Sequence, residues 1–279
     1  YGFLFLTDLF GDIPYFQALD VENYPAPAFT PQEQIYPDLI KRLKEAAAML
    51  EPGSTPIWAS GDLIYNGNIA QWRKFANSLI LRIAMRTSNT SYAATAAQEF
   101  AAAWAASRFE SNADNADLNW TGNLPSQNPI YEQLVLQSRD GDFRMSETMI
   151  GALQSRNDPR LPIYAKPAAS DGQFRGLPNG NEPADLGRTV SDYSTLGDRF
   201  LSPAYPSVLM SYAEVLFLGA EAAERGWIAA DPATLYRQGV QASMLEHGVP
   251  QGEIDANLAQ PSVAYTGLES ILTQKWIAL

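Results

Sequence analysis

The sequence predicts a mostly α-helical fold, in which tetratricopeptide-like helix pairs form an α-solenoid scaffold that carries a loop-rich flank. Apolar residues recur at helical spacing towards both ends of the chain. The middle segment, residues 109–206, is instead rich in Asn, Asp, Gly, Pro and Ser, which interrupt long helices. Residues 212–248 fit two helices joined by a short loop, at about the 34-residue period of tetratricopeptide repeats, although the full repeat consensus is absent.

The first strong helix signal covers residues 31–51. Thr30, Pro31 and Glu33 match a capping box, with Thr30 as the N-cap and Pro31 as the first helical residue. An apolar stripe follows, and Pro52-Gly53 is expected to end the helix. The stripe consists of Ile35, Leu39, Ile40, Leu43, Ala46, Ala47 and Leu50.

An Asn-Gly-Asn sequence at 66–68 breaks regular structure before a second helix, predicted over residues 69–88. Its apolar residues recur at helical spacing and indicate a buried face. We therefore expect Trp72 and Phe75 to be buried. We also expect the amide of Asn77 to bond the backbone of a neighbouring segment and so fix how adjacent helices pack.

The remaining helices follow from the same two signals, apolar periodicity and terminal punctuation. Gly226 ends one of them, and Asp231-Pro232 begins the next as N-cap and first helical residue. These helices are predicted over 92–107, 146–155, 207–225, 232–247 and 266–279. Any strands should be short and confined to 52–65 or 109–206.

Composition and charge exclude several classes of protein. The chain of 279 residues has 46% hydrophobic residues, enough for a substantial core. It carries 31 acidic against 19 basic residues, and the net charge of −12 argues against binding nucleic acid or an anionic membrane surface. Cysteine is absent, so neither a disulfide nor a thiol nucleophile is available. No apolar run approaches the ~18 residues of a transmembrane helix.

No catalytic motif stands out, and we expect a protein that is not an enzyme. His247 is the only histidine, and its position late on a helix suits a structural role beside the helix dipole. One histidine without cysteine excludes a zinc site of the usual type. No P-loop, G-x-S-x-G or G-x-G-x-x-G motif occurs. A carboxylate pair of a glycosidase stays open, because such pairing is spatial. The available carboxylates include Asp62, Asp114, Asp117, Asp140 and Asp142.

Two short segments could offer oxygen ligands to calcium. They are residues 112–117, with the sequence NADNAD, and residues 140–142, with the sequence DGD. Neither matches an EF-hand loop, and solvated Asx turns are the favoured interpretation. We therefore expect no metal and no cofactor, with a structural calcium ion as the alternative.

Six segments resemble signature sequences of one family, in the same order along the chain. Residues 72–86, WRKFANSLILRIAMR, match the pattern W-x-K-F-A-N-S-L-x-L-R-x-A-x-R. The others are TDLFGDIPY at 7–15, the helix at 30–50, DPRLP at 158–162, YAEV leading to AEAA at 212–223, and TQKWIAL at 273–279. Together they resemble the SusD/RagB family, the surface nutrient-binding lipoproteins of Bacteroidota.

The resemblance implies a single SusD-like domain over residues 1–279. Its helical scaffold would comprise 1–108 and 207–279, and its ligand side would be the loop-rich segment 109–206. Neither end of the chain carries a helix cap, so we expect a domain truncated at both ends. In the family, a signal peptide, a lipid-bearing cysteine and further helices would precede residue 1, and another helical segment would follow residue 279.

The same resemblance implies a function at the outer membrane, on the cell surface. The protein would bind a glycan or another oligomeric nutrient without cleaving it, and deliver it to a SusC-like TonB-dependent transporter. Contact with the membrane would be made only through the upstream lipid anchor. Two alternatives stay open: a tetratricopeptide-like scaffold for protein interactions, and a glycoside hydrolase.

The ligand site is predicted on the loop-rich flank, where aromatic side chains lie among amides. Carbohydrate recognition stacks an aromatic ring on the apolar face of a sugar, while amides and guanidinium groups bond its hydroxyls. A single loop aromatic more often fills a small satellite core beneath its loop. The predicted ligand-binding residues are Asn119, Trp120, Asn123, Tyr131, Phe174, Arg175 and Tyr193.

Overall fold

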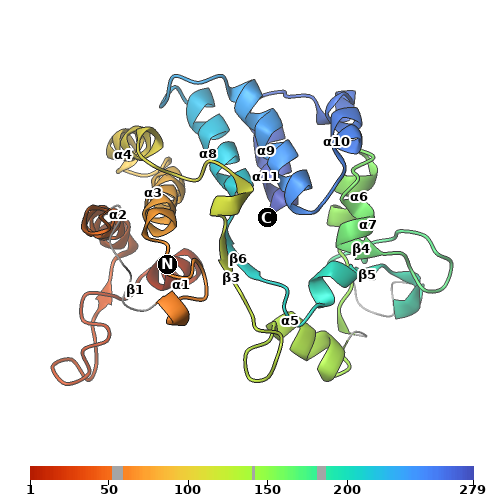
Figure 1. Cartoon of the computed structure of the whole chain (residues 1–279), viewed down its shortest axis with the longest axis horizontal. Helices are drawn as coiled ribbons and strands as arrows, with labels where there is room; N and C mark the ends of the chain where they lie inside the picture. Colours follow the sequence, from red (N-terminus) through yellow and green to blue (C-terminus); the bar gives the residue numbers. More distant parts are fainter. Residues whose placement is uncertain (52–58, 140–141, 181–186) are drawn as a thin grey trace.

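The computed structural model describes residues 1–51, 59–139, 142–180 and 187–279, and these are mostly helical, as predicted (Figure 1). Consecutive helices pack on one another: α2 on α3, α3 on α4 and α8 on α9. The helices are α1 (Gly2–Phe10), α2 (Gln32–Met49), α3 (Ile69–Arg86), α4 (Ala93–Ala105), α5 (Pro129–Tyr131), α6 (Glu147–Gln154), α7 (Leu161–Tyr164), α8 (Tyr212–Glu224), α9 (Pro232–Glu246), α10 (Gln251–Leu258) and α11 (Leu268–Ala278).

Three antiparallel strand pairs complete the described part of the chain. They are β1 (Ile13–Pro14) with β2 (Phe29–Thr30), β3 (Ala116–Leu118) with β6 (Ser207–Met210), and β4 (Ala165–Lys166) with β5 (Thr195–Leu196). The pair β1–β2 and the strand β6 lie outside 52–65 and 109–206. The prediction that strands are confined to these two regions was therefore wrong. The part of the predicted region 52–65 that spans 52–58 lies outside the described residues.

The α2 helix begins differently from the predicted capping box. Thr30 belongs to β2 and pairs with Ile13, and Pro31 is the N-cap residue without a side-chain cap. The backbone N–H of Gln32 donates instead to Oδ1 of Asp12, at 2.9 Å. The first turn is therefore capped by a side chain 20 residues upstream. The helix ends at Met49, and the predicted stop at 52–53 lies outside the described residues.

The helix predicted over 207–225 begins only at Tyr212, because residues 207–210 form β6. Ser211 caps α8 by accepting the N–H of Glu214, at 3.2 Å. The backbone N–H of Tyr212 donates to Oδ1 of Asn115, at 2.7 Å, so the residue just before β3 also holds the start of α8. Four further helices, α1, α5, α7 and α10, were not predicted.

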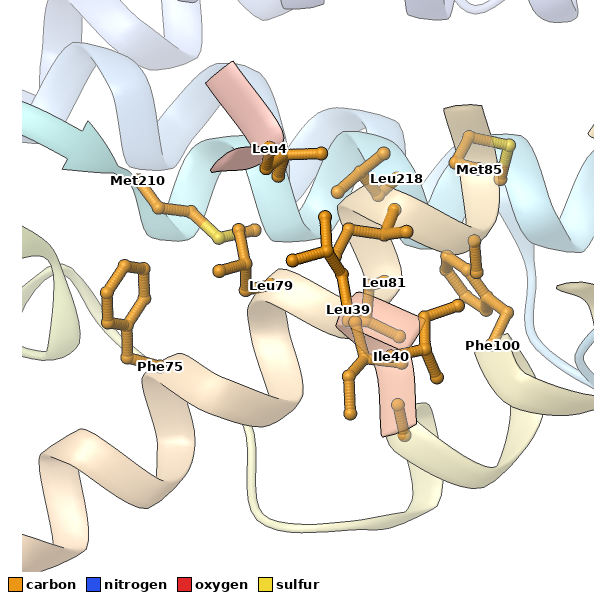
Figure 2. Close-up of a cluster of buried hydrophobic side chains, with 14 of the residues drawn as sticks. Leu4, Leu39, Ile40, Phe75, Leu79, Leu81, Met85, Phe100, Met210 and Leu218 are labelled. Carbon is orange, nitrogen blue, oxygen red and sulfur yellow. The ribbon is translucent and has the colours of Figure 1, made fainter. Parts of the chain in front are cut away.

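The α3 helix lies at the centre of the first core, between α2 and α4 and against α8. In Figure 2, Leu79 and Leu81 of α3 lie in one cluster with Leu39 of α2 and Leu218 of α8, and Phe75 lies at one end of this cluster. Asn68 is the N-cap and accepts the N–H of Gln71, which explains the observed start. Core packing therefore surrounds this helix from Phe75 to Met85, where every residue except Arg82 is buried.

Two of the three predictions for this helix are confirmed. Phe75 is buried, and Nδ2 of Asn77 donates to the carbonyl of Ser107, at 2.7 Å. Trp72 is only half-buried, so the prediction that it is a core residue was wrong. Its ring lies at the edge of the core, where Nε1 donates to Oδ2 of Asp62, at 2.7 Å.

A second core joins α8, α9 and α11. The two helices α8 and α9 approach closely because Gly239 has no side chain. A Cβ atom at Gly239 would lie 2.9 Å from Cε1 of Phe217. Gly226, with φ of 72°, follows the end of α8, and Asp231 caps α9 by accepting the N–H of Thr234. The observed end of α8 and the observed start of α9 agree with the prediction.

The predicted flank, 109–206, contains short helices that are anchored to the scaffold. The helix predicted over 146–155 is confirmed as α6, with Ser146 as its N-cap. Arg160, at the start of α7, is completely buried. Its guanidinium donates to the carboxylate of Asp158, to Oγ of Ser243 on α9 and to Oε1 of Gln274 on α11. The flank therefore occupies a fixed position on the scaffold.

Candidate functional site

The seven predicted ligand-binding residues fall into two groups on the flank. Asn119, Trp120 and Asn123 follow β3, and Tyr131 ends α5. Phe174, Arg175 and Tyr193 belong to two segments near β5. In the described part of the chain, no recorded hydrogen bond or ring contact joins one group to the other. The structure thus places the predicted residues in two groups without such a contact between them.

Trp120 is half-buried and held by its polar edge. Its Nε1 donates to Oγ of Ser207 on β6, at 3.0 Å. Asn119 is exposed, and its Nδ2 donates to the carbonyls of Leu63 and Asp117, at 3.1 and 3.0 Å. These bonds fix the orientation of the indole and of the neighbouring amide, while part of the ring stays accessible.

Asn123 belongs to a tight hairpin, and Tyr131 follows it in the chain. Asn123 pairs with Ser126, and its Nδ2 donates to the carbonyl of Thr121, at 3.3 Å. Asn128, which is buried, caps α5 by accepting the N–H groups of Ile130 and Tyr131. The hairpin is therefore an ordered, exposed projection beside Trp120.

In the second group, Arg175 holds its own loops together by hydrogen bonds. Nη1 of Arg175 donates to the carbonyl of Asp192, and Nη2 donates to Oδ2 of Asp171, both at 2.7 Å. The backbone of Arg175 pairs with Ser194. Phe174 is half-buried, and Tyr193 is only 4% exposed. In this conformation, Tyr193 offers almost no surface to a ligand.

A polar cleft between β3, the segment 198–206 and the end of α9 was not predicted. It encloses about 470 Å³. Its residues come from three distant parts of the chain, so no local sequence pattern could reveal it. The lining consists of Asn112, Asn115, Asp117, Arg199, Ser202, Ala204, Tyr205, Pro206, Val208 and Glu246.

Two carboxyl groups in this cleft have raised pKa values. Burial raises the pKa of Asp117. Burial, and then the nearby charge of Asp117, raise the pKa of Glu246 to about 7. In the sequence, Asp117 was considered as one of several available carboxylates and as part of the segment 112–117 weighed for calcium. Glu246 is therefore partly protonated at neutral pH.

His247 is packed in an aromatic cluster beside the cleft. Its ring lies 4.9 Å from that of Tyr164 and 6.1 Å from that of Phe200. Burial, and then the positive charge of Arg199, lower the pKa of His247 to about 4, so the ring is neutral at physiological pH. His247 is also the residue that follows the last turn of α9. These contacts agree with a structural role, but a neutral ring lacks the positive charge that the predicted interaction with the helix dipole needs.

A second hollow of about 750 Å³ lies between α1, β6 and α11. Its lining is mostly apolar and includes Tyr1 and Leu279. Arg82 and Glu214 cross its wall as a bidentate ion pair, with two bonds of 2.6 Å. These charges satisfy each other and leave the hollow without a free ionic group on this wall.

Two of the carboxylates considered for calcium, Asp114 and Asp142, are engaged in the protein itself. The carboxylate of Asp114 accepts bonds from Nζ of Lys74 and from the backbone N–H of Glu110. Asp142 pairs with Arg139, and Asp140 lies outside the described residues. Among the described residues, no group of three or more His, Cys, Asp and Glu side chains has the geometry of a metal site. A structural calcium ion stays an untested prediction.

The helices of the described chain share one further property. None of them is both long enough and apolar enough to cross a membrane.

The whole chain, residues 1–279, matches the family model SusD-like_2, described as starch-binding and associating with the outer membrane. No curated protein matches the sequence. A chitin-binding protein of known structure is 32% identical, with a TM-score of 0.85 over 98% of this chain and 61% of its own. A chitin-binding SusD homologue from Flavobacterium johnsoniae is 27% identical, with a TM-score of 0.86 over 99% of this chain and 63% of its own.

A SusD homologue from Bacteroides uniformis is 27% identical, with a TM-score of 0.84 over 98% of this chain and 62% of its own. The chain thus spans somewhat less than two thirds of the length of these relatives. The match extends over every helix and over the flank, and the chain belongs to the SusD-like family.

Proposed function

We propose that this chain is part of a cell-surface protein that binds a glycan without cleaving it. The observation that carries the proposal is the family match over all 279 residues. Two of the similar structures are chitin-binding proteins, so oligomers of N-acetylglucosamine are the first ligands to test. Delivery of the glycan to a SusC-like TonB-dependent transporter, and a lipid anchor outside residues 1–279, complete the proposal.

Trp120 is the best-supported platform for the glycan. Its indole edge is fixed by Ser207, which reduces the entropy that a mobile ring would lose on binding. The exposed amides of Asn119 and Asn123 lie within three residues of it. Two proposed contacts of lower priority are Arg175, which is bonded to Asp171, and Tyr193, which is buried. Tyr131 and Phe174 are retained at the same lower priority.

The proposal predicts a modest affinity that depends on Trp120. We expect Kd values between about 1 μM and 1 mM for an N-acetylglucosamine oligomer. Trp120→Ala should weaken binding by about 1–3 kcal/mol, the range found when aromatic stacking is removed. Isothermal titration of both proteins, together with a thermal melt of each, measures this difference.

Trp276→Ala is the matched control. Trp276 lies on α11, is 44% exposed and is absent from both cavities. Its replacement should leave the affinity unchanged. Equal affinities of wild type and Trp120→Ala would remove Trp120 from the site, and a collapse in stability would make it a core residue. Release of shorter sugars from the oligomer would contradict binding without cleavage.

A further inference from the structure

The polar cleft beside β3 combines hydrogen-bond donors and acceptors in a space of ligand size. Its volume of about 470 Å³ falls within the ~300–1,000 Å³ of small-molecule sites. Amide, hydroxyl, carboxyl and guanidinium groups line it, and Tyr205 adds one aromatic ring. Such a mixture suits a ligand that both donates and accepts hydrogen bonds.

The basic group of the cleft is held in place. Nη2 of Arg199 donates to the carbonyl of Glu246, at 2.8 Å, and the guanidinium carbon lies 5.8 Å from the ring centre of Tyr205. Asn115 is only 7% exposed, and its Oδ1 accepts the N–H of Tyr212. The donors of the cleft are thus preorganised by bonds to the protein.

The acceptors of the cleft are less fully satisfied. Oδ1 of Asp117 is shielded from solvent and has no hydrogen-bond donor among the described residues. A buried acceptor without a donor is unfavourable, so rotation of the Asp117 carboxyl group towards the cleft would let this oxygen gain a bond from a ligand hydroxyl. Oδ1 of Asn112, which also lines the cleft, lacks a donor in the same way.

The charges of the cleft favour a neutral ligand. Two carboxyl groups, Asp117 and Glu246, face one guanidinium, Arg199. The carboxylates would repel an anion. The guanidinium would repel a bare cation, which could be bound only by the oxygen atoms of the cleft. A neutral molecule rich in hydroxyl groups can pair with both kinds of group.

The cleft and the proposed platform share the β3–β6 ribbon. Asp117 pairs with Val208, and Leu118 pairs with Ser207, which holds Trp120. Three residues of extended chain span at most about 11 Å, so Asp117 lies near enough to Trp120 for one oligosaccharide to reach both.

We propose that the cleft formed by Asp117, Arg199, Tyr205 and Glu246 is a second carbohydrate subsite, which takes one neutral sugar unit of the glycan. The inference rests on the proposed glycan-binding function and assigns a further part of the molecule to it. The sugar hydroxyls donate to the two carboxyl groups and accept from the guanidinium, and Tyr205 covers one side.

The test compares Glu246→Ala with Glu253→Ala by titration with a trimer of N-acetylglucosamine. Loss of hydrogen bonds to a charged group should weaken binding by about tenfold in Glu246→Ala. Glu253 is exposed on α10 and makes no recorded side-chain contact, so Glu253→Ala should bind like the wild type. Thermal melts at pH 8 should show Glu246→Ala as stable as wild type, because the change relieves repulsion from Asp117.

A second measurement reads the cleft directly. In protein labelled with ¹⁵N-arginine, the Nε–H signal of Arg199, assigned with Arg199→Lys, should shift when N-acetylglucosamine monomer is added. A shift produced by calcium chloride instead of the sugar would make the cleft a cation site and overturn the inference.

The outcomes separate this inference from the proposed function. If the trimer binds and Glu246→Ala binds equally well, the subsite is wrong and glycan binding stands. If the trimer does not bind the wild type, the proposed ligand class fails. In that case a shift of the Arg199 signal with another neutral monosaccharide supports the subsite, and the absence of a shift with every sugar overturns it.

Discussion

Arg160 is a charged side chain with no exposed surface. Its guanidinium is fully buried and bonded to Asp158, Ser243 and Gln274. Charge burial on this scale is unfavourable unless each donor is paired. The buried ion pair therefore fixes the position of α7 against α9 and α11 more than it adds net stability.

Asp158→Asn should destabilise the protein by about 3–5 kcal/mol, because it leaves the Arg160 charge buried without its counter-charge. Urea unfolding followed by circular dichroism measures the loss. The control is Asp142→Asn, which removes one half of an exposed pair with Arg139 and should leave the midpoint unchanged. A small effect of Asp158→Asn would show that water reaches Arg160.

Glu246 makes stability depend on pH. Its folded-state pKa of about 7 exceeds the usual 4.5, so the folded protein holds this proton more tightly than the unfolded chain. The stabilisation is complete below pH 4.5 and is lost as pH rises towards 7, by up to about 3 kcal/mol. Glu246→Gln removes this dependence.

The measurement is the difference in unfolding free energy between Glu246→Gln and wild type. It should favour the variant increasingly from about pH 4.5 to pH 7 and then stay constant. The wild-type curve alone is flatter, because the lowered pKa of His247 acts in the opposite direction between about pH 4 and 6.5. A constant difference across this range would show that Glu246 is solvated.

Some helices begin at a residue fixed by its neighbours in the sequence, and others at a residue fixed by contacts from far along the chain. The starts of α3 and α9 could be predicted because Asn68 and Asp231 cap them from the adjacent position. The start of α2 could not, since its capping carboxylate belongs to Asp12 and a strand pair brings it there. Residues 207–210 were predicted as helix because their apolar run continues into α8, whereas pairing with β3 makes them a strand.

Gly239→Ala tests the approach of α8 to α9. Alanine favours the helix, but its Cβ would lie 2.9 Å from the ring of Phe217, and overpacking of this kind costs about 1–3 kcal/mol. The control is Gly252→Ala on α10, where nothing lies within 4 Å of the new Cβ. That change should stabilise by about 0.5–1 kcal/mol. Equal effects on the unfolding midpoint would argue that the helix pair is loosely packed.

At the scale of the whole molecule, the sequence predicted the fold better than the site. The sequence signal for the fold comes from many apolar positions, such as those of α3, and each of them adds to the same helical periodicity. The cleft depends on Asp117 and Glu246, which are far apart in the chain and meet only after folding. Trp120 could be singled out by residue type, but its bond to Ser207 could not be foreseen.

The net charge of −12 gives a test of what kind of ligand the molecule takes. Between ~0.01 and ~1 M salt the Debye length falls from about 30 to about 3 Å, which screens the field of the protein. Affinity for a neutral N-acetylglucosamine oligomer should stay constant over this range. A cationic peptide would instead lose affinity steeply, so a salt series of titrations tells the two ligand classes apart.

The ion pair between Arg82 and Glu214 also sets the order in which the protein can assemble during its synthesis. Its two partners are 132 residues apart, and ribosomes add roughly 5–20 residues per second. Arg82 therefore waits about 7–26 s for the carboxylate that neutralises it. Gln274, which bonds Arg160, follows even later, 114 residues after that arginine. The early helices emerge without the contacts that complete them, and a nascent chain that stops short of α8 leaves Arg82 without its counter-charge.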